Sequence, residues 1–149
     1  MRFTIDCIPK AKGRPRTVTL ATGYVSTYTP APTRQYENKV RAICQKACKG
    51  RHFQEGVPLR VEAWFYMPIP RSGSKATKER LRNAFHTVKP DIDNLMKSIL
   101  DGCNKCAYAD DNQVSEVYAH KKYSDCPRTE VIIRVCEGGL DQCRRESSD

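Results

Sequence analysis

The sequence predicts an α+β protein with a mixed β-sheet and helices packed mainly on one face. Segments with alternating apolar residues lie near both ends of the 149-residue chain. A clear helical spacing of apolar residues lies between them, and no internal repeat is evident. Strands on both sides of helices suggest this fold class. We expect a single domain over residues 1–136, followed by a polar and flexible tail at 137–149.

The first third of the chain indicates a strand, a loop, a hairpin and a helix. Residues 2–8 alternate as a strand does, and a basic loop with prolines follows at 9–16. Residues 17–29 are rich in Thr, Val and Tyr, which suggests a β-hairpin or an extended flap. Thr29 is the expected cap of a helix that reaches about Cys48.

The remainder alternates between strands and helices. Residues 57–67 form an expected strand, 75–82 a short basic helix and 92–103 a longer helix. Two further strands are expected at 114–120 and 128–135. The longer helix has the clearest apolar stripe of the chain, made of Ile92, Leu95, Met96, Ile99, Leu100 and Cys103.

Four aspartates surround this longer helix. Asp91 and Asp93 lie at its start, and Asp110 and Asp111 follow its end. Clustered carboxylates repel one another unless a cation neutralises them, and hard oxygen ligands suit Mg²⁺, Mn²⁺ or Ca²⁺. Helix capping and the helix dipole account for acids at the start of the helix but not for the second pair. A returning loop could bring Asp111 back toward the first pair.

A lysine lies on the same helix face as the first aspartates. Lys97 follows Asp93 by four residues, so the two could form a surface ion pair that Asp101 extends. The functional alternative is a lysine beside a metal-bound phosphate, where it stabilises developing charge. A calcium EF-hand loop fits the sequence poorly, because Met96 and Gly102 stand where that loop needs a glycine and an acid.

The charge of the chain is unevenly distributed. Residues 1–90 carry 18 basic and 5 acidic side chains, whereas residues 91–149 carry 8 and 12. A basic surface binds the phosphate backbone of nucleic acids by releasing counterions. Together with the acidic cluster, this charge predicts a nucleic-acid-binding protein that cleaves phosphodiesters.

The eight cysteines allow two interpretations. No apolar run is long enough to span a bilayer and the start of the chain does not look like a signal peptide, so we expect a cytoplasmic protein without disulfides. Cys103 and Cys106 have the spacing of zinc ligands, and Cys44 and Cys48 share a helix face. With no second such pair and with scattered histidines, we expect reduced, partly buried thiols instead.

The two acidic motifs together resemble the RusA family of Holliday junction resolvases. The first is K-P-D-I-D-N-L-x-K-x-x-x-D at 89–101, and the second is Y-x-D-D-x-Q-V at 108–114. The resemblance extends from residue 2 to about residue 136. It implies an α+β fold, a homodimer, cleavage of branched DNA, a Mg²⁺ cofactor for which Mn²⁺ could substitute, and a bacterial or phage origin.

The resemblance also implies the roles of individual residues. Asp91, Asp93 and Asp111 correspond to the family's metal-binding acids, with Asp110 beside them, and Lys97 corresponds to its important lysine. We therefore expect a Mg²⁺-dependent, structure-selective endodeoxyribonuclease that resolves four-way junctions by paired nicks in DNA recombination and repair. The expected DNA-binding residues are Lys10, Lys12, Arg14, Arg16, Lys75, Lys78 and Arg82.

Two other functions remain open on the sequence. One is a module that binds branched DNA with little cleavage activity. The other is a metal-dependent phosphoesterase that acts on small or single-stranded substrates. Cation-dependent nicking of DNA would distinguish a junction nuclease from the binding module. Competition between junction, duplex and single-stranded DNA would distinguish it from the phosphoesterase.

Overall fold

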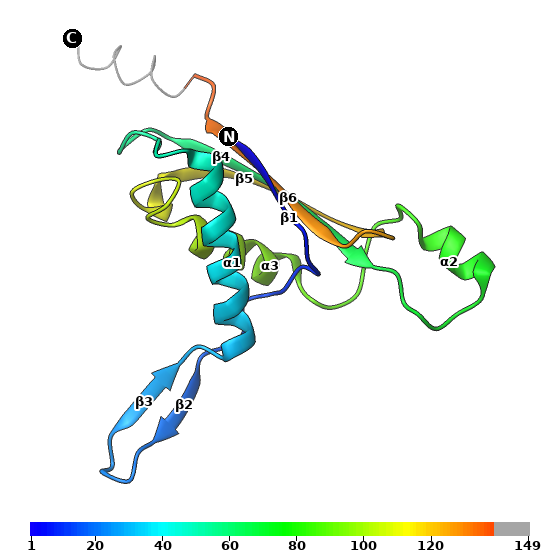
Figure 1. Cartoon of the computed structure of the whole chain (residues 1–149), viewed down its shortest axis with the longest axis horizontal. Helices are drawn as coiled ribbons and strands as arrows, with labels where there is room; N and C mark the ends of the chain where they lie inside the picture. Colours follow the sequence, from blue (N-terminus) through cyan, green and yellow to red (C-terminus); the bar gives the residue numbers. More distant parts are fainter. Residues whose placement is uncertain (139–149) are drawn as a thin grey trace.

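The computed structural model describes residues 1–138, which form the expected α+β fold (Figure 1). Its four-stranded sheet has the order β1-β6-β4-β5. The strands are β1 (Arg2–Ile5), β4 (Leu59–Pro68), β5 (Val114–Ser124) and β6 (Arg128–Val135). Strand β4 pairs with β5 in parallel and with β6 in antiparallel, and β1 pairs with β6 in antiparallel. The sheet is therefore mixed, as the sequence predicts.

Two helices, α1 (Ala31–Cys48) and α3 (Ile92–Cys103), cover one face of this sheet (Figure 1). Strand β4 alternates strictly between buried and half-buried residues, because successive side chains of a strand point to opposite faces. Its buried residues join the helices in the core: Leu59, Val61, Ala63, Phe65 and Met67. On the opposite face Trp64 stacks on His120, with 3.8 Å between the ring centroids.

A glycine lets the two helices approach closely. A Cβ atom added at Gly102 of α3 would lie 2.5 Å from Cγ1 of Val40 on α1, closer than atoms can pack. Residues without a side chain allow helix axes to come nearer than ordinary packing permits. The close approach packs the last turn of α3 against α1 near Val40, and Cys44 and Cys103 are both fully buried.

Two arms extend from this body. The antiparallel hairpin of β2 (Arg16–Thr19) and β3 (Val25–Tyr28) projects beyond the start of α1, and helix α2 (Lys75–Leu81) lies on another side of the molecule (Figure 1). The hairpin confirms one of the two predicted alternatives for this segment. Its side chains are exposed, including Tyr24 at 76%.

Some predicted boundaries were wrong. Strand β1 ends at Ile5 rather than at residue 8, because the Cys7 amide donates to the Ile5 carbonyl at 3.0 Å and turns the chain. Thr29 does not cap α1: Pro30 is the N-cap residue and no side chain caps the helix. Strand β5 continues past residue 120, because its pairing with β4 continues to Ser124.

A polar tail was predicted at 137–149, and residues 139–149 of it lie outside the part of the chain that the structure describes. Within the described part, all seven cysteines are free thiols. Burial raises the pKa of the Cys106 thiol to about 12. No helix in residues 1–138 combines the length and the apolar character that crossing a membrane requires.

Candidate metal and nucleic-acid site

The first acidic pair lies at the start of α3. Asp91 is the N-cap residue of α3, yet its side chain makes no capping hydrogen bond. Asp93 lies in the first turn. Both are exposed, and neither forms an ion pair within residues 1–138. Capping, the simplest structural explanation for Asp91, therefore does not account for this side chain, and both carboxylates are available to an external cation.

An open pocket of about 540 Å³ lies beside this pair. The start of α3, the segment before it and the middle of β5 form its walls. Lys121 of β5 donates from Nζ to the carbonyls of Val88 at 2.6 Å and Pro90 at 2.7 Å, which anchors the segment that leads into Asp91. The lining residues are Phe85, His86, Asp91, Ile92, Asp93, Ala119, His120 and Lys121.

His86 is the residue of this pocket that the sequence analysis missed. Its side chain is only 8% exposed, and its Nδ1 atom has no hydrogen-bond partner. Burial, reinforced by the positive charge of Lys121, lowers the pKa of His86 below its ordinary value. A buried imidazole thus lines the same pocket as the first acidic pair. Its only sequence signal is a position five residues before Asp91, which is weak without a structure.

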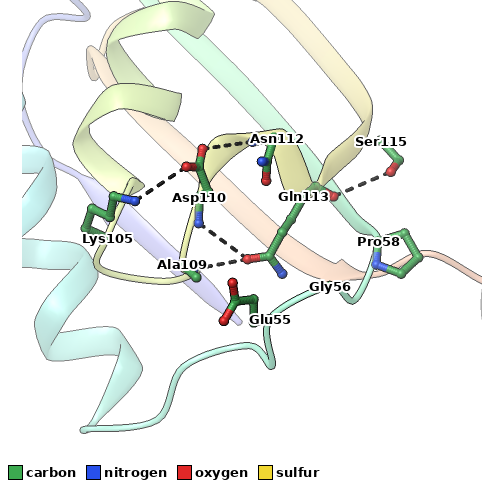
Figure 2. Close-up of a pocket in the computed structure, with 9 residues that line it drawn as sticks. All are labelled: Glu55, Gly56, Pro58, Lys105, Ala109, Asp110, Asn112, Gln113 and Ser115. Carbon is green, nitrogen blue, oxygen red and sulfur yellow. Dashed lines mark hydrogen bonds and ion pairs between the residues drawn. The ribbon is translucent and has the colours of Figure 1, made fainter.

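The second acidic pair lies beyond the other end of α3, and one of its residues, Asp110, has a structural role there (Figure 2). Asp110 caps the 3₁₀ turn η1 (Asp111–Gln113) by accepting from the Asn112 amide at 3.3 Å. The Gln113 side chain accepts from the Asp110 amide in return, which completes a capping box. Lys105 lies 3.4 Å from the Asp110 carboxylate. The Asn112 amide, followed by Asp111 and Lys105, holds the pKa of Asp110 below its ordinary value.

Gln113 ties this turn to the segment before β4. Its buried side chain donates from Nε2 to the carbonyls of Gln54 at 2.9 Å and Val57 at 3.2 Å. Its Oε1 also accepts from the Ala109 amide at 3.1 Å. Figure 2 shows this side chain extending along the wall of a cavity of about 430 Å³. The glutamine of the second motif is therefore a structural residue that fixes the position of the acidic pair.

Asp111 remains exposed and is held near other carboxylates. A hydrogen bond with Asp110 raises the pKa of Asp111, and burial and the negative charges of Asp110 and Asp101 raise it further. Neighbouring carboxylates repel one another, and a bound cation relieves that repulsion. The structure therefore places Asp111 with Asp101 and Asp110, at the carboxyl-terminal end of α3.

The return path of the chain decides which residues meet. Strand β5 runs back along α3 and places Lys121, not Asp111, beside Asp91. In residues 1–138, the only three potential ligands within 4.8 Å of one another are cysteines, so Asp91, Asp93 and Asp111 do not form such a group. A single chain thus presents acidic groups at both ends of α3, which its 12 residues separate by about 18 Å.

Lys97 lies on the exposed face of α3 between these groups. It forms no ion pair with Asp93 or Asp101 in the described chain, so the surface-pair explanation does not apply in this structure. Asp101 pairs with Lys12 instead, at 2.5 Å. The Lys97 ammonium is therefore available to an external anion.

The predicted DNA-binding residues divide into two groups. Lys12 pairs with Glu37 at 2.8 Å as well as with Asp101; burial lowers its pKa, but these two carboxylates outweigh burial and raise it overall. Arg82 pairs with Asp125 at 2.6 Å and with Glu79. The other predicted residues form no ion pair within residues 1–138, so their charges are not neutralised by neighbouring side chains there: Lys10, Arg14, Arg16, Lys75 and Lys78.

Comparison with known proteins gives consistent matches over almost the whole fold. The family model described as Endodeoxyribonuclease RusA matches residues 6–134. The Bacillus subtilis (strain 168) protein YqaN, described as uncharacterized, is 33% identical over 141 residues, covering 90% of this chain and 95% of the relative. The crossover junction endodeoxyribonuclease rusA of Lactococcus phage r1t is 27% identical over 132 residues, covering 88% of this chain and 93% of the relative. The family match includes both acidic pairs and both arms.

Proposed function

The chain belongs to the RusA endodeoxyribonuclease family, and from this premise we propose that it is a Mg²⁺-dependent, structure-selective endodeoxyribonuclease that resolves four-way DNA junctions by paired nicks. The observation that carries this proposal is the exposed pair Asp91 and Asp93, which has no partner within the described chain of an otherwise basic protein. The name of the phage relative supports the substrate class. The corresponding cellular roles are DNA recombination and repair.

The first acidic pair fits a magnesium ion. Mg²⁺ is usually held by one or two carboxylates, with water and substrate phosphates completing its coordination, so two free carboxylates are sufficient. Asp91 and Asp93 are the proposed ligands, and Mn²⁺ is a chemically suitable substitute. Asp111, with Asp110 beside it, offers further oxygen ligands at the other end of α3. When bound, such a cation polarises the phosphodiester and lowers the pKa of water.

The neighbouring side chains supply positioning and charge. Lys97 lies on the same helix face as Asp93 and would stabilise negative charge on the phosphate. His86 lines the same pocket, and its Nδ1 is buried without a hydrogen-bond partner, so this side chain would help to position the segment that carries Asp91 rather than contact solvent. Gln113 and the cap at Asp110 keep the second acidic group in place.

The two arms extend the contact with DNA. The unpaired basic residues Lys10, Arg14 and Arg16 lie at the base of the hairpin, and Lys75 and Lys78 lie in α2. They would bind phosphates on either side of the acidic sites by counterion release. Lys12 and Arg82 would contribute less, because their charges are already paired.

Two nicks in one junction require two active sites, so the proposal includes a homodimer. The exposed hairpin residues Tyr24, Val25 and Tyr28 are candidates for the contact between subunits or for stacking on opened bases. Sedimentation at micromolar concentration should give about twice the mass of one chain. A monomer both free and bound to a junction would contradict paired nicking.

A branched-DNA-binding module with little cleavage is the second candidate. It is favoured by one observation, namely that Asp91, Asp93 and Asp111 do not form a single group within one chain. A nicking assay on an immobile four-way junction separates the two, with linear duplex and single strand as competitors. The proposal expects junction cleavage with Mg²⁺ and none with EDTA. Binding without cleavage in Mg²⁺ and in Mn²⁺ would favour the module.

A further inference from the structure

A group of sulfur ligands lies away from the acidic sites, where α1, α3 and the turn after α3 meet. The Sγ atoms of Cys44, Cys48 and Cys106 all lie within 4.8 Å of one another, and all three residues are buried. Cys103 is fully buried, lies three residues before Cys106 and has its thiol next to that of Cys44. Three thiols therefore meet at one buried point, with the buried Cys103 beside them.

The sulfur spacing suits a metal better than a disulfide. The Sγ atoms of Cys44 and Cys48 are 4.0 Å apart. Four sulfurs around a tetrahedral zinc, each about 2.3 Å from the ion, are roughly 3.8 Å from one another. A disulfide requires about 2.05 Å between the sulfurs. Small shifts of side chains would thus close a tetrahedral site.

The backbone between the last two cysteines is shaped to present both. The Cys106 amide donates to the Cys103 carbonyl at 3.1 Å and closes a tight turn. Asn104 has φ −61° and ψ 137°, and Lys105 has φ 60°, which together match a type II turn. A lysine is unfavourable at that second position, so the turn is held by its surroundings rather than by local preference.

The surroundings resemble the outer shell of a structural metal site. His52 Nδ1 donates to the Cys106 carbonyl at 2.5 Å, which fixes the backbone of that ligand. The Met1 Sδ atom lies 3.4 Å from the Cys48 sulfur. A cavity of about 250 Å³, lined in part by Cys48 and His52, adjoins the cluster.

We propose that Cys44, Cys48, Cys103 and Cys106 form a structural site for a thiophilic divalent cation, Zn²⁺. Sulfur ligands select such ions over Mg²⁺, and four protein ligands leave no open position for a substrate. The ion would replace the thiol protons and join the ends of α1 and α3 to the turn that leads to Asp110. The site is independent of the proposed nuclease activity.

The test measures metal rather than cleavage. The full chain, produced with zinc and purified under reducing conditions, should contain about one zinc per chain when its metal content is measured by elemental mass spectrometry. Replacement of zinc by Co²⁺ should give thiolate-to-cobalt charge-transfer absorption and the intense visible bands of tetrahedral coordination. Cys48→Ser, Cys103→Ser and Cys106→Ser should each lose most of the metal. Cys7→Ser and Cys126→Ser lie outside the cluster and are the matched controls that should retain it.

Three results would overturn the proposal. One is wild-type protein that takes up neither zinc nor cobalt after reconstitution, a measurement that does not depend on whether any variant folds. Another is full zinc content in both Cys48→Ser and Cys106→Ser. The third is a disulfide within the cluster of freshly reduced and zinc-treated protein, seen as a mass two hydrogens below that of the free thiols.

Discussion

Asp91 and Asp110 are both N-cap residues, yet the fold treats them differently. Asp110 accepts a hydrogen bond from its own turn and belongs to a capping box, whereas the Asp91 side chain caps nothing. Asp110 is also paired with Lys105, whereas Asp91 lies at an open pocket without an ion pair in the described chain. Two aspartates in equivalent local positions therefore differ in their surroundings: Asp110 is part of the local structure, whereas Asp91 is the proposed cation ligand.

The same contrast applies to the two ends of α3. We call the surroundings of Asp91, Asp93 and His86 the open end, and those of Asp110, Gln113 and the four cysteines the braced end. At the braced end most polar groups have partners, and the exceptions are the exposed Asp111 and the buried Oδ1 of Asn104. At the open end two carboxylates and an imidazole nitrogen lack partners. Substitutions at the open end should thus affect chemistry, and those at the braced end should affect stability.

The largest effect is expected from Asp91→Asn or Asp93→Asn. Asparagine keeps the shape but removes the charge that a cation needs. We expect the single-turnover cleavage rate to fall by about 100- to 1,000-fold, while junction affinity and unfolding stability change little. Gel-shift titration and quenched-flow kinetics on a four-way junction measure both. Asp6→Asn, the same change at an exposed acid, is the matched control. Mg²⁺-dependent rates near wild type would remove the residue from the ligand set.

The next largest effect is expected at the braced end. Gln113→Ala removes a buried side chain that bonds Ala109, Asp110, Gln54 and Val57, and it leaves those backbone groups without partners. We expect the free energy of unfolding to fall by about 2–3 kcal/mol. Urea denaturation measures it. Asn112→Ala, an exposed neighbour in the same turn, should change stability by less than about 0.5 kcal/mol. Equal losses in both variants would contradict the bracing role.

Lys97→Ala tests a residue between the two ends. If its ammonium acts on the phosphate in the transition state, the rate at saturating DNA should fall by about 10-fold or more, and affinity by less. A residue that only contacts phosphate would weaken binding and reduce the salt dependence by about one charge. Matched binding and single-turnover curves distinguish these roles. A pure affinity defect would reduce Lys97 to a DNA contact.

The smallest change in stability is expected from Asp111→Asn. The pKa of Asp111 is raised in the folded state, so its negative charge lowers stability at pH values above that pKa. This cost disappears as pH falls through the raised pKa, because the carboxyl becomes protonated. The variant should therefore melt slightly above wild type at pH 7 in metal-free buffer, and the difference should vanish at acidic pH.

Cleavage by Asp111→Asn is expected to fall even though the variant is more stable, because the proposed metal oxygens are lost. Differential scanning calorimetry across pH, with and without Mg²⁺, measures the stability change. Added Mg²⁺ should stabilise wild type more than the variant. A variant less stable than wild type at pH 7 without metal would contradict the repulsion between Asp110 and Asp111.

The sequence by itself determined the fold class and most elements. The apolar spacing of residues 92–103 predicted helix α3 with its observed bounds, and alternation predicted β6 over 128–135. These patterns are local, since a helix or strand must turn its apolar side chains toward one core. The two motifs also identified the family, because their order and spacing are specific.

Only the tertiary structure decided which of these residues meet. The parallel pairing of β4 and β5 places Lys121 at the open end and leaves Asp111 at the braced end, and the His86 amide joins the open end by donating to the Lys121 carbonyl at 2.9 Å. The close crossing at Gly102 brings together cysteines that are far apart in sequence. The sequence alone favoured separate reduced thiols, whereas this grouping is the basis for the proposed zinc site. Whether a lysine such as Lys12 is free or paired depends on Glu37 and Asp101, which come from two different helices. Such contacts depend on how the chain returns on itself, which local patterns do not encode.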